Sequence, residues 1–135
     1  MALVVDATVG GASSNSYQTT AEITAYFLGR VPSTISAQWT ALSATDKDAA
    51  NVMATTWMEA LVHWTHFATT ITQALQWPQY GQWDRRGWKM IPSDVIPLEL
   101  KNCHAEIDLY FAQEDRIADF DPIKLGIQLI RAGSV

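Results

Sequence analysis

The feature that most limits the fold of this chain is a long run of apolar residues with helical spacing in its middle. Met53, Trp57 and Leu61 recur at intervals of three or four residues, and Ala50 and Trp64 extend the pattern at either end. This is the period of an α-helix that packs one face against a core. The spacing predicts the longest helix of the chain, which should fade in the threonine-rich stretch 65–72 because β-branched residues favour other structure.

A shorter helix is predicted ahead of it. Thr19 and Glu22 have the spacing of a capping box, in which the hydroxyl and the carboxylate each bind a backbone N–H of the first turn. Gly29 suits the left-handed position beyond the end of this helix. Its apolar face consists of Ile23, Tyr26 and Phe27.

Three further signals complete the helical pattern. Ser43 and Asp46 form an N-cap signal for the long helix, and residues 36–42 predict one or two helical turns around a tryptophan. Pro97 suits the first position of another helix, because its missing N–H costs nothing there. That helix should run to about Asp115. Its predicted buried stripe is Leu100, Cys103, Ile107, Tyr110 and Phe111.

These patterns predict a mainly α fold, a small helical bundle with a long aromatic loop. A chain of 135 residues can bury one core, and three amphipathic stripes can cover one another within it. The predicted core residues are Tyr26, Phe27, Met53, Trp57, Leu61, Leu100, Ile107 and Phe111.

The two ends of the chain predict extended arms around a single helical domain, residues 1–120. Residues 1–18 read as a short strand or arm followed by a loop, and residues 121–135 as an extended C-terminal arm. In that arm Ile123, Leu125, Ile127 and Leu129 alternate with other residues, which is a strand pattern. We expect this segment to dock on a neighbouring subunit; the alternative is that it folds back onto its own helices.

Composition and charge exclude several classes of protein. The net charge of −5 argues against general binding to phosphate backbones. The one cysteine, Cys103, has no internal partner, and the N-terminal residues lack the pattern of a signal peptide, so we expect synthesis in a reducing cytoplasm. No apolar run approaches the roughly 20 residues of a membrane span.

Motifs that carry chemistry are scarce. The phosphate-binding patterns GxGxxG and GxxxxGK, the GxSxG motif and any CxxC pair are absent. Glu59, His63 and His66 could lie along one side of a helix as metal ligands, but the spacing matches no standard zinc motif, and we expect a structural role. Cys103 is expected to be a buried structural cysteine rather than half of a pair with His104. The sequence therefore predicts no enzyme, no metal and no cofactor.

The stretch 76–97 is the strongest candidate for a functional site. It holds three of the six tryptophans, and Asp84 to Gly87 has the pattern of a hairpin turn. Its mixture of aromatic and basic residues fits contact with a protein, packing of the loop on itself, or binding of single-stranded nucleic acid. The predicted protein-interface residues are Trp77, Tyr80, Trp83, Arg85, Arg86, Trp88 and Lys89, together with Ile123, Leu125, Ile127, Leu129 and Ile130 of the C-terminal arm.

Several short motifs, in this order, resemble one protein family over about residues 2–115. They are Asn15-Ser16-Tyr17, Ala21-Glu22, Ala25-Tyr26-Phe27, Trp77-Pro78, the DxxG turn at Asp84 to Gly87, and Ile91-Pro92-Ser93-Asp94-Val95-Ile96-Pro97 before a helix. The family is that of tailed-phage head-to-tail connectors, also called adaptor or head-completion proteins. Its members are often automatically labelled DnaT-like single-stranded-DNA-binding proteins. The family commonly has a basic residue after Trp-Pro, where this chain has Gln79.

The resemblance implies a virion structural protein without catalytic activity. It implies a ring, dodecameric in form, that lies beneath the portal and extends the DNA channel toward the tail. The implied partners are the portal protein, neighbouring connector subunits, downstream tail or neck proteins, and passing genomic DNA bound without sequence specificity. The implied location is the neck of the virion after synthesis in the host cytoplasm. The alternative is a single-stranded-DNA-binding module that uses the loop 77–89.

Overall fold

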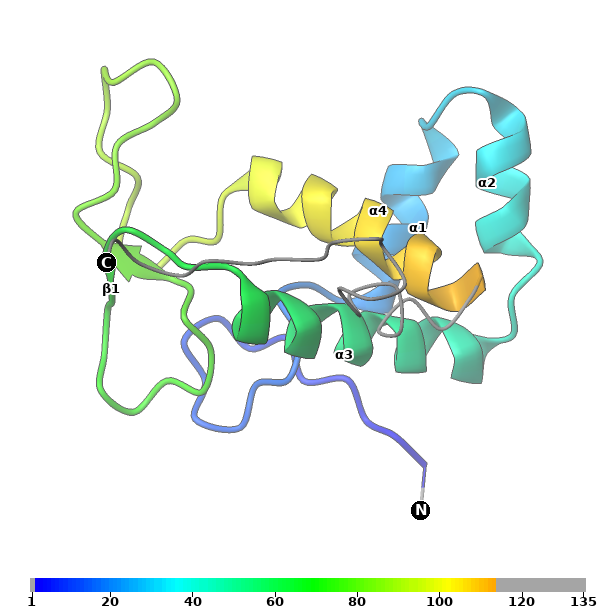
Figure 1. Cartoon of the computed structure of the whole chain (residues 1–135), viewed down its shortest axis with the longest axis horizontal. Helices are drawn as coiled ribbons and strands as arrows, with labels where there is room; N and C mark the ends of the chain where they lie inside the picture. The colour runs from blue at the N-terminus through cyan, green and yellow to red at the C-terminus, as the bar shows by residue number, and fades with distance from the viewer. Residues whose placement is uncertain (1, 114–135) are drawn as a thin grey trace, which may run out of the picture.

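The computed structural model describes residues 2–113, which form a mainly helical domain, as the sequence predicts (Figure 1). None of the helices in this range is long and apolar enough to cross a bilayer. The elements are α1 (Thr20–Leu28), α2 (Ser33–Thr40), α3 (Ala44–Leu61), β1 (Phe67–Ala68), β2 (Gln79–Tyr80) and α4 (Leu98–Gln113).

The helix starts agree with the capping signals in the sequence. Thr19 caps α1, and its Oγ1 accepts from the Glu22 N–H at 3.2 Å while the Glu22 carboxylate accepts from the Thr19 N–H at 2.8 Å. Ser43 caps α3 by accepting from the Asp46 N–H at 3.1 Å. The predicted left-handed Gly29 is wrong, because its φ is −96° and its N–H continues helical bonding to the last turn of α1.

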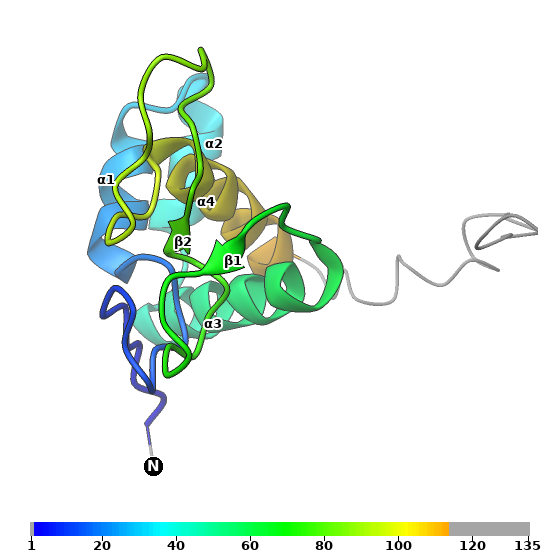
Figure 2. The same cartoon turned by 90° about the vertical axis from the view of Figure 1, so that its left-hand side faces the viewer.

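The two longest helices form the centre of the domain. The helices α3 and α4 lie side by side in both views (Figures 1 and 2), and Figure 1 shows that they run in opposite directions. At one end α1 and α2 close the bundle, where Phe27 stacks on Trp39 with ring centroids 5.2 Å apart. This first core cluster consists of Ile23, Phe27, Trp39, Ala105 and Leu109.

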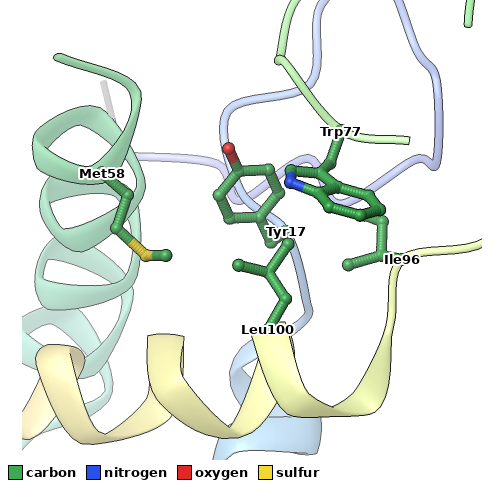
Figure 3. Close-up of a cluster of buried hydrophobic side chains, with 5 residues drawn as sticks. All are labelled: Tyr17, Met58, Trp77, Ile96 and Leu100. Carbon is green, nitrogen blue, oxygen red and sulfur yellow. The ribbon is translucent and has the colours of Figure 1, made fainter. Parts of the chain in front are cut away.

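A second core cluster joins the helices to the loops (Figure 3). It consists of Tyr17, Met58, Trp77, Ile96 and Leu100. Three of these residues lie outside any helix, so apolar packing fixes the N-terminal segment and both ends of the aromatic loop. The spacing of apolar residues in the helices does not predict these contacts.

The buried face of α3 differs from the predicted one. Met53 is 38% exposed and Leu61 is 52% exposed, so both are wrong as core predictions. The helix also ends at Leu61, before Trp64. Its buried residues are Ala50, Asn51, Ala54, Thr55 and Met58. The stripe is displaced by about one residue, or roughly 100° around the helix.

The buried face of α4 is also displaced by about one residue from the predicted face, in the same direction as that of α3. Cys103 and Tyr110 are exposed, contrary to the prediction, and His104 and Asp108 are fully buried in their place. Of the other predicted core residues, Phe27, Leu100 and Phe111 are buried, and Tyr26, Trp57 and Ile107 are half-buried.

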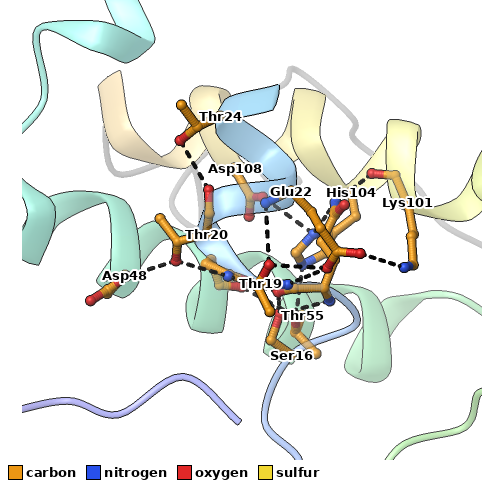
Figure 4. A network of polar contacts seen from close by, with 12 residues as sticks. Ser16, Thr19, Thr20, Glu22, Thr24, Asp48, Thr55, Lys101, His104 and Asp108 are labelled. Carbon is orange, nitrogen blue, oxygen red and sulfur yellow. Dashed lines mark hydrogen bonds and ion pairs between the residues drawn. The ribbon is translucent and has the colours of Figure 1, made fainter. Parts of the chain in front are cut away.

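Polar contacts between the helices explain both displacements (Figure 4). His104 Nε2 lies 2.7 Å from Thr55 Oγ1, and that hydroxyl donates to the Asn51 carbonyl at 3.2 Å. The Gln18 amide donates to His104 Nδ1 at 3.1 Å and to the Lys101 carbonyl at 2.6 Å. Buried polar groups are tolerated when they bind one another. Small and polar residues can therefore occupy the inner faces, and larger apolar ones such as Met53 turn outward.

Asp108 is the least satisfied member of this buried region. Its Oδ2 lies 3.2 Å from His104 Nδ1, and neither carboxylate oxygen has a hydrogen bond within the described residues. Burial raises the pKa of Asp108 to about 6, against an ordinary value of 3.8, because the charged form is desolvated. The neighbouring His104 ring opposes this rise in pKa but does not cancel it.

The N-terminal segment is extended but is not a free arm. Residues 2–18 contain no strand; Asn15 and Ser16 N–H groups bind the Asp6 carbonyl at 2.9 and 3.2 Å, and the Ala74 N–H binds the Gly11 carbonyl at 3.0 Å. The C-terminal arm 121–135, with its predicted strand Ile123–Ile130, lies outside the described residues.

Burial of the Asp108 carboxyl should make the free energy of unfolding depend on pH, and Asp108→Asn should remove that dependence. Because the pKa of Asp108 is higher in the folded chain, its contribution is present at pH 4 and is lost as the pH rises through 6. The free energy of unfolding of the wild type, relative to that of the variant, should fall by about 2 kcal/mol between pH 4 and 7.5 in urea titrations. The matched control is Asp94→Asn, at an exposed carboxylate. A pH-independent difference between wild type and Asp108→Asn would contradict the prediction.

Two tryptophans of the same loop should differ sharply in their effect on stability. Trp77 is 5% exposed within the second core cluster, whereas Trp88 is 79% exposed. Trp77→Ala should lower the free energy of unfolding by about 3–5 kcal/mol, because it leaves a cavity. Trp88→Ala should change it by less than about 0.5 kcal/mol. Urea unfolding followed by circular dichroism measures both, and equal losses would contradict this assignment.

Candidate nucleic-acid interface

The centre of the aromatic loop forms the hairpin that the sequence predicts. Trp83 and Met90 form an antiparallel bridge, the Ile91 N–H donates to the Gln82 carbonyl at 2.7 Å, and the Asp84 N–H donates to the Lys89 carbonyl at 2.7 Å. Gly87 has a φ of +71°, a conformation that suits glycine. The hairpin projects from the end of the bundle opposite α1 and α2 (Figure 1).

Asp84 fixes the turn of this hairpin. Its Oδ1 accepts from the backbone N–H of Trp88 at 2.8 Å and of Lys89 at 3.3 Å, and its carbonyl accepts from the Gly87 N–H at 2.8 Å. The hydrogen bond from Trp88 is the main cause that lowers the pKa of Asp84. An ionised Asp84 therefore holds the turn, leaving the side chains of Arg85 and Arg86 exposed.

The exposed side chains of the hairpin are aromatic and basic. Trp83, Trp88 and Lys89 are exposed, as are both arginines. The Arg86 guanidinium carbon lies 5.8 Å from the centroid of a Trp88 ring, within the range of a cation–π contact. Arg86 is also 3.8 Å from the Asp84 carboxylate, a weak surface ion pair. A ring that is this open to solvent can be covered by another planar group.

A two-stranded ribbon at the base of the loop adds two more exposed rings. Phe67 of β1 pairs directly with Tyr80 of β2, so both side chains lie on one face of the ribbon. Phe67 is 85% exposed and Tyr80 is 67% exposed. Phe67 has no signal in the sequence, because only the cross-strand register brings residue 67 beside residue 80. We define the aromatic–basic surface as Phe67, Tyr80, Trp83, Arg85, Arg86, Trp88 and Lys89.

Charge is distributed unevenly between this surface and the rest of the domain. Residues 83–90 carry three cations and one carboxylate, whereas the remainder of the range 2–113 carries three cations and nine carboxylates. Outside the hairpin, Lys101 pairs with Glu22 at 2.9 Å and Arg30 pairs with Glu106. In the described range Arg85 and Lys89 form no ion pair. The hairpin is thus a basic projection on an acidic body.

The structure places most of the predicted interface residues on this surface. Tyr80, Trp83, Arg85, Arg86, Trp88 and Lys89 are all exposed. Trp77 is the exception, because its indole packs edge-on against Trp64, with ring centroids 5.6 Å apart, and lies in the core. Ile123, Leu125, Ile127, Leu129 and Ile130 lie outside the described residues.

The residues considered as metal ligands have other partners or point to solvent. The Glu59 carboxylate accepts from the Gln76 N–H at 3.1 Å and from the Tyr17 hydroxyl, while His63 and His66 are exposed. In residues 2–113, no three His, Cys, Asp or Glu side chains are grouped as a metal site would require. Glu59 thus ties the aromatic loop to α3.

Comparison with known proteins places the chain in a family. A family model described as "Putative DnaT-like ssDNA binding protein" matches residues 1–125. No curated protein and no solved structure matches significantly. The description of this family model does not mention a phage connector. Because it covers nearly the whole sequence, this chain belongs to the DnaT-like single-stranded-DNA-binding protein family.

Proposed function

We propose that this chain binds single-stranded DNA through the aromatic–basic surface. The observation that carries the proposal is the exposed Trp88 ring beside the Arg86 guanidinium, at the end of a hairpin whose turn is fixed by Asp84. Single-strand-binding proteins stack bases on exposed aromatic rings and hold phosphates with nearby cations. Membership of the family supports the same function.

The distribution of charge sets the character of this binding. Phosphates are attracted to Arg85, Arg86 and Lys89, and the carboxylates of the body repel any strand that extends beyond the hairpin. The footprint is therefore a few nucleotides. Because the electrostatic part of the attraction comes from exposed cations, binding weakens as salt screens it. Several copies side by side would be needed to hold a long strand.

Changes at the hairpin should weaken DNA binding without unfolding the chain. Trp88→Ala should reduce affinity for a short oligothymidylate by about 1–3 kcal/mol, because one stacking platform is lost. Arg86→Ala should reduce the slope of log K against log salt by about 0.7, the value for one phosphate contact with a single strand. Fluorescence anisotropy with labelled oligothymidylate at low salt measures both.

The matched control is Lys47→Ala, which removes a cation from α3 on the acidic body. It should leave the affinity and its salt dependence near those of the wild type. Unchanged affinity in Trp88→Ala and Arg86→Ala, or an equal loss in Lys47→Ala, would contradict the use of this surface.

A second candidate function is that of a head-to-tail connector in a virion. The observation that favours it is the combination of large exposed apolar side chains with an acidic body: Phe67, Trp88 and Leu98 are each more than half exposed, and the net charge is −5. Trp and Arg are the side chains that carry most binding energy at protein interfaces. An acidic ring beneath the portal would let genomic DNA pass without gripping its phosphates. In this role the chain is structural and catalyses no reaction.

The double variant Trp88→Ala/Arg86→Ala separates the two candidates. A connector needs these side chains for assembly, so the variant should fail to join portal complexes while its free energy of unfolding stays within about 0.5 kcal/mol of wild type. Electron microscopy of the chain mixed with its portal protein measures assembly. Normal assembly together with lost oligothymidylate binding would reject the connector role.

A further inference from the structure

An apolar groove lies beside the hairpin, and its rim includes Arg85 of the aromatic–basic surface. Its volume is about 730 Å³ and its walls come from α3, α4 and the aromatic loop. The main lining side chains are Trp57, Val62, Trp64, Leu100, Cys103 and Ile107. Polar side chains contribute at Asp84, Arg85 and Glu99. A groove of this size and composition is suited to an apolar ligand or an apolar peptide segment.

We propose that this groove is occupied by the chain's own segment Ile123–Ile130. Its sequence places Ile123, Leu125, Ile127 and Leu129 on one side of an extended backbone, with Lys124 and Gln128 on the other. One side of the segment is thus continuously apolar and the other can face water. An apolar groove and an apolar strand face remove each other from solvent, which is favourable in proportion to the area buried.

The chain is long enough to make this contact. The helix α4 ends at Gln113 and carries groove residues from Leu100 to Ile107. At 1.5 Å per residue, the far end of that wall is roughly 20 Å from Gln113. The connecting residues 114–122 can span roughly 30 Å when extended. The segment can therefore reach the full length of the groove formed by its own chain.

Charge at the groove favours the same occupant. The charged side chains that line the groove are Asp84, Arg85 and Glu99, with a sum of −1, and Glu99 is exposed without an ion pair within the described residues. The segment itself carries Lys124 and is followed by Arg131, without any carboxylate in residues 123–135. Opposite charges at the edge of an apolar contact add orientation more than affinity. They favour the basic C-terminal segment over an acidic peptide.

The chain's own segment is favoured over that of a second copy. A tethered segment meets its site at an effective concentration in the millimolar range, well above that of a second molecule in dilute solution. From the sequence we expected the segment to dock on a neighbouring subunit, with its own helices as the alternative. The effective concentration favours the groove of its own chain.

Cys103 provides a direct test, because it is the one cysteine of the chain, is exposed within residues 2–113 and lines the groove. In the full-length wild type, N-ethylmaleimide should modify it slowly. Ile127→Asp places a charge on the apolar side of the segment and should raise the rate about tenfold, the value expected if the groove is occupied nine-tenths of the time. The matched control, Gln128→Asp, places the same charge on the other side and should react like the wild type.

Equal rates in the wild type and Ile127→Asp would overturn the proposal. Protection that increases with protein concentration would overturn the assignment to the chain's own segment and indicate exchange between copies. As a second measurement, cysteines placed singly at positions 123, 125, 127 and 129 and oxidised should give a disulfide with Cys103 inside one monomer from at least one position, whereas Gln128→Cys should give none. Disulfide-linked dimers, or no disulfide, would also overturn it. Ile127 lies outside the aromatic–basic surface, so failure here leaves the proposed DNA binding open to its own test.

Discussion

The packing of α3 against α4 depends on a buried polar network, and the rest of the domain is arranged around it. His104 binds Thr55 on α3 and Gln18 from the N-terminal segment, and Asn51 donates to the Gln18 carbonyl at 3.0 Å. Inside a low-dielectric core such bonds are strong, and leaving one partner unsatisfied costs about 1–3 kcal/mol. The network therefore fixes how the two helices are rotated, and it draws residues 14–18 into the core.

The same packing holds the base of the aromatic loop while leaving its hairpin exposed. Glu59 on α3 binds the Tyr17 hydroxyl and the Gln76 backbone, and Trp77 then enters the core beside Tyr17. At the other end of the loop, Ile96 packs in the same cluster. Between these two fixed points Asp84 closes the turn by its own hydrogen bonds. The hairpin can thus keep Trp88 in solvent, because the stability of the domain rests on other side chains.

This division of charge allows an acidic protein to carry the DNA-binding surface that we propose. Carboxylates are concentrated on the body, where Glu22 and Glu106 are paired with cations, whereas the hairpin carries three cations and one carboxylate. A local basic surface attracts phosphate over distances shorter than a Debye length, even when the net charge is −5. The net charge alone argues against binding to nucleic acid.

The sequence by itself determined the elements whose signals are local. The capping residues Thr19 and Ser43, the long central helix and the turn at Asp84 to Gly87 depend on neighbours within a few positions. Tertiary structure alone decided which faces are buried, because His104 and Asn51 look like surface residues until their partners are known. It also decided that Trp77 belongs to the core and that Phe67 joins Tyr80 on the exposed ribbon. Those outcomes depend on residues distant in sequence, and hydrophobic period carries no information about such contacts.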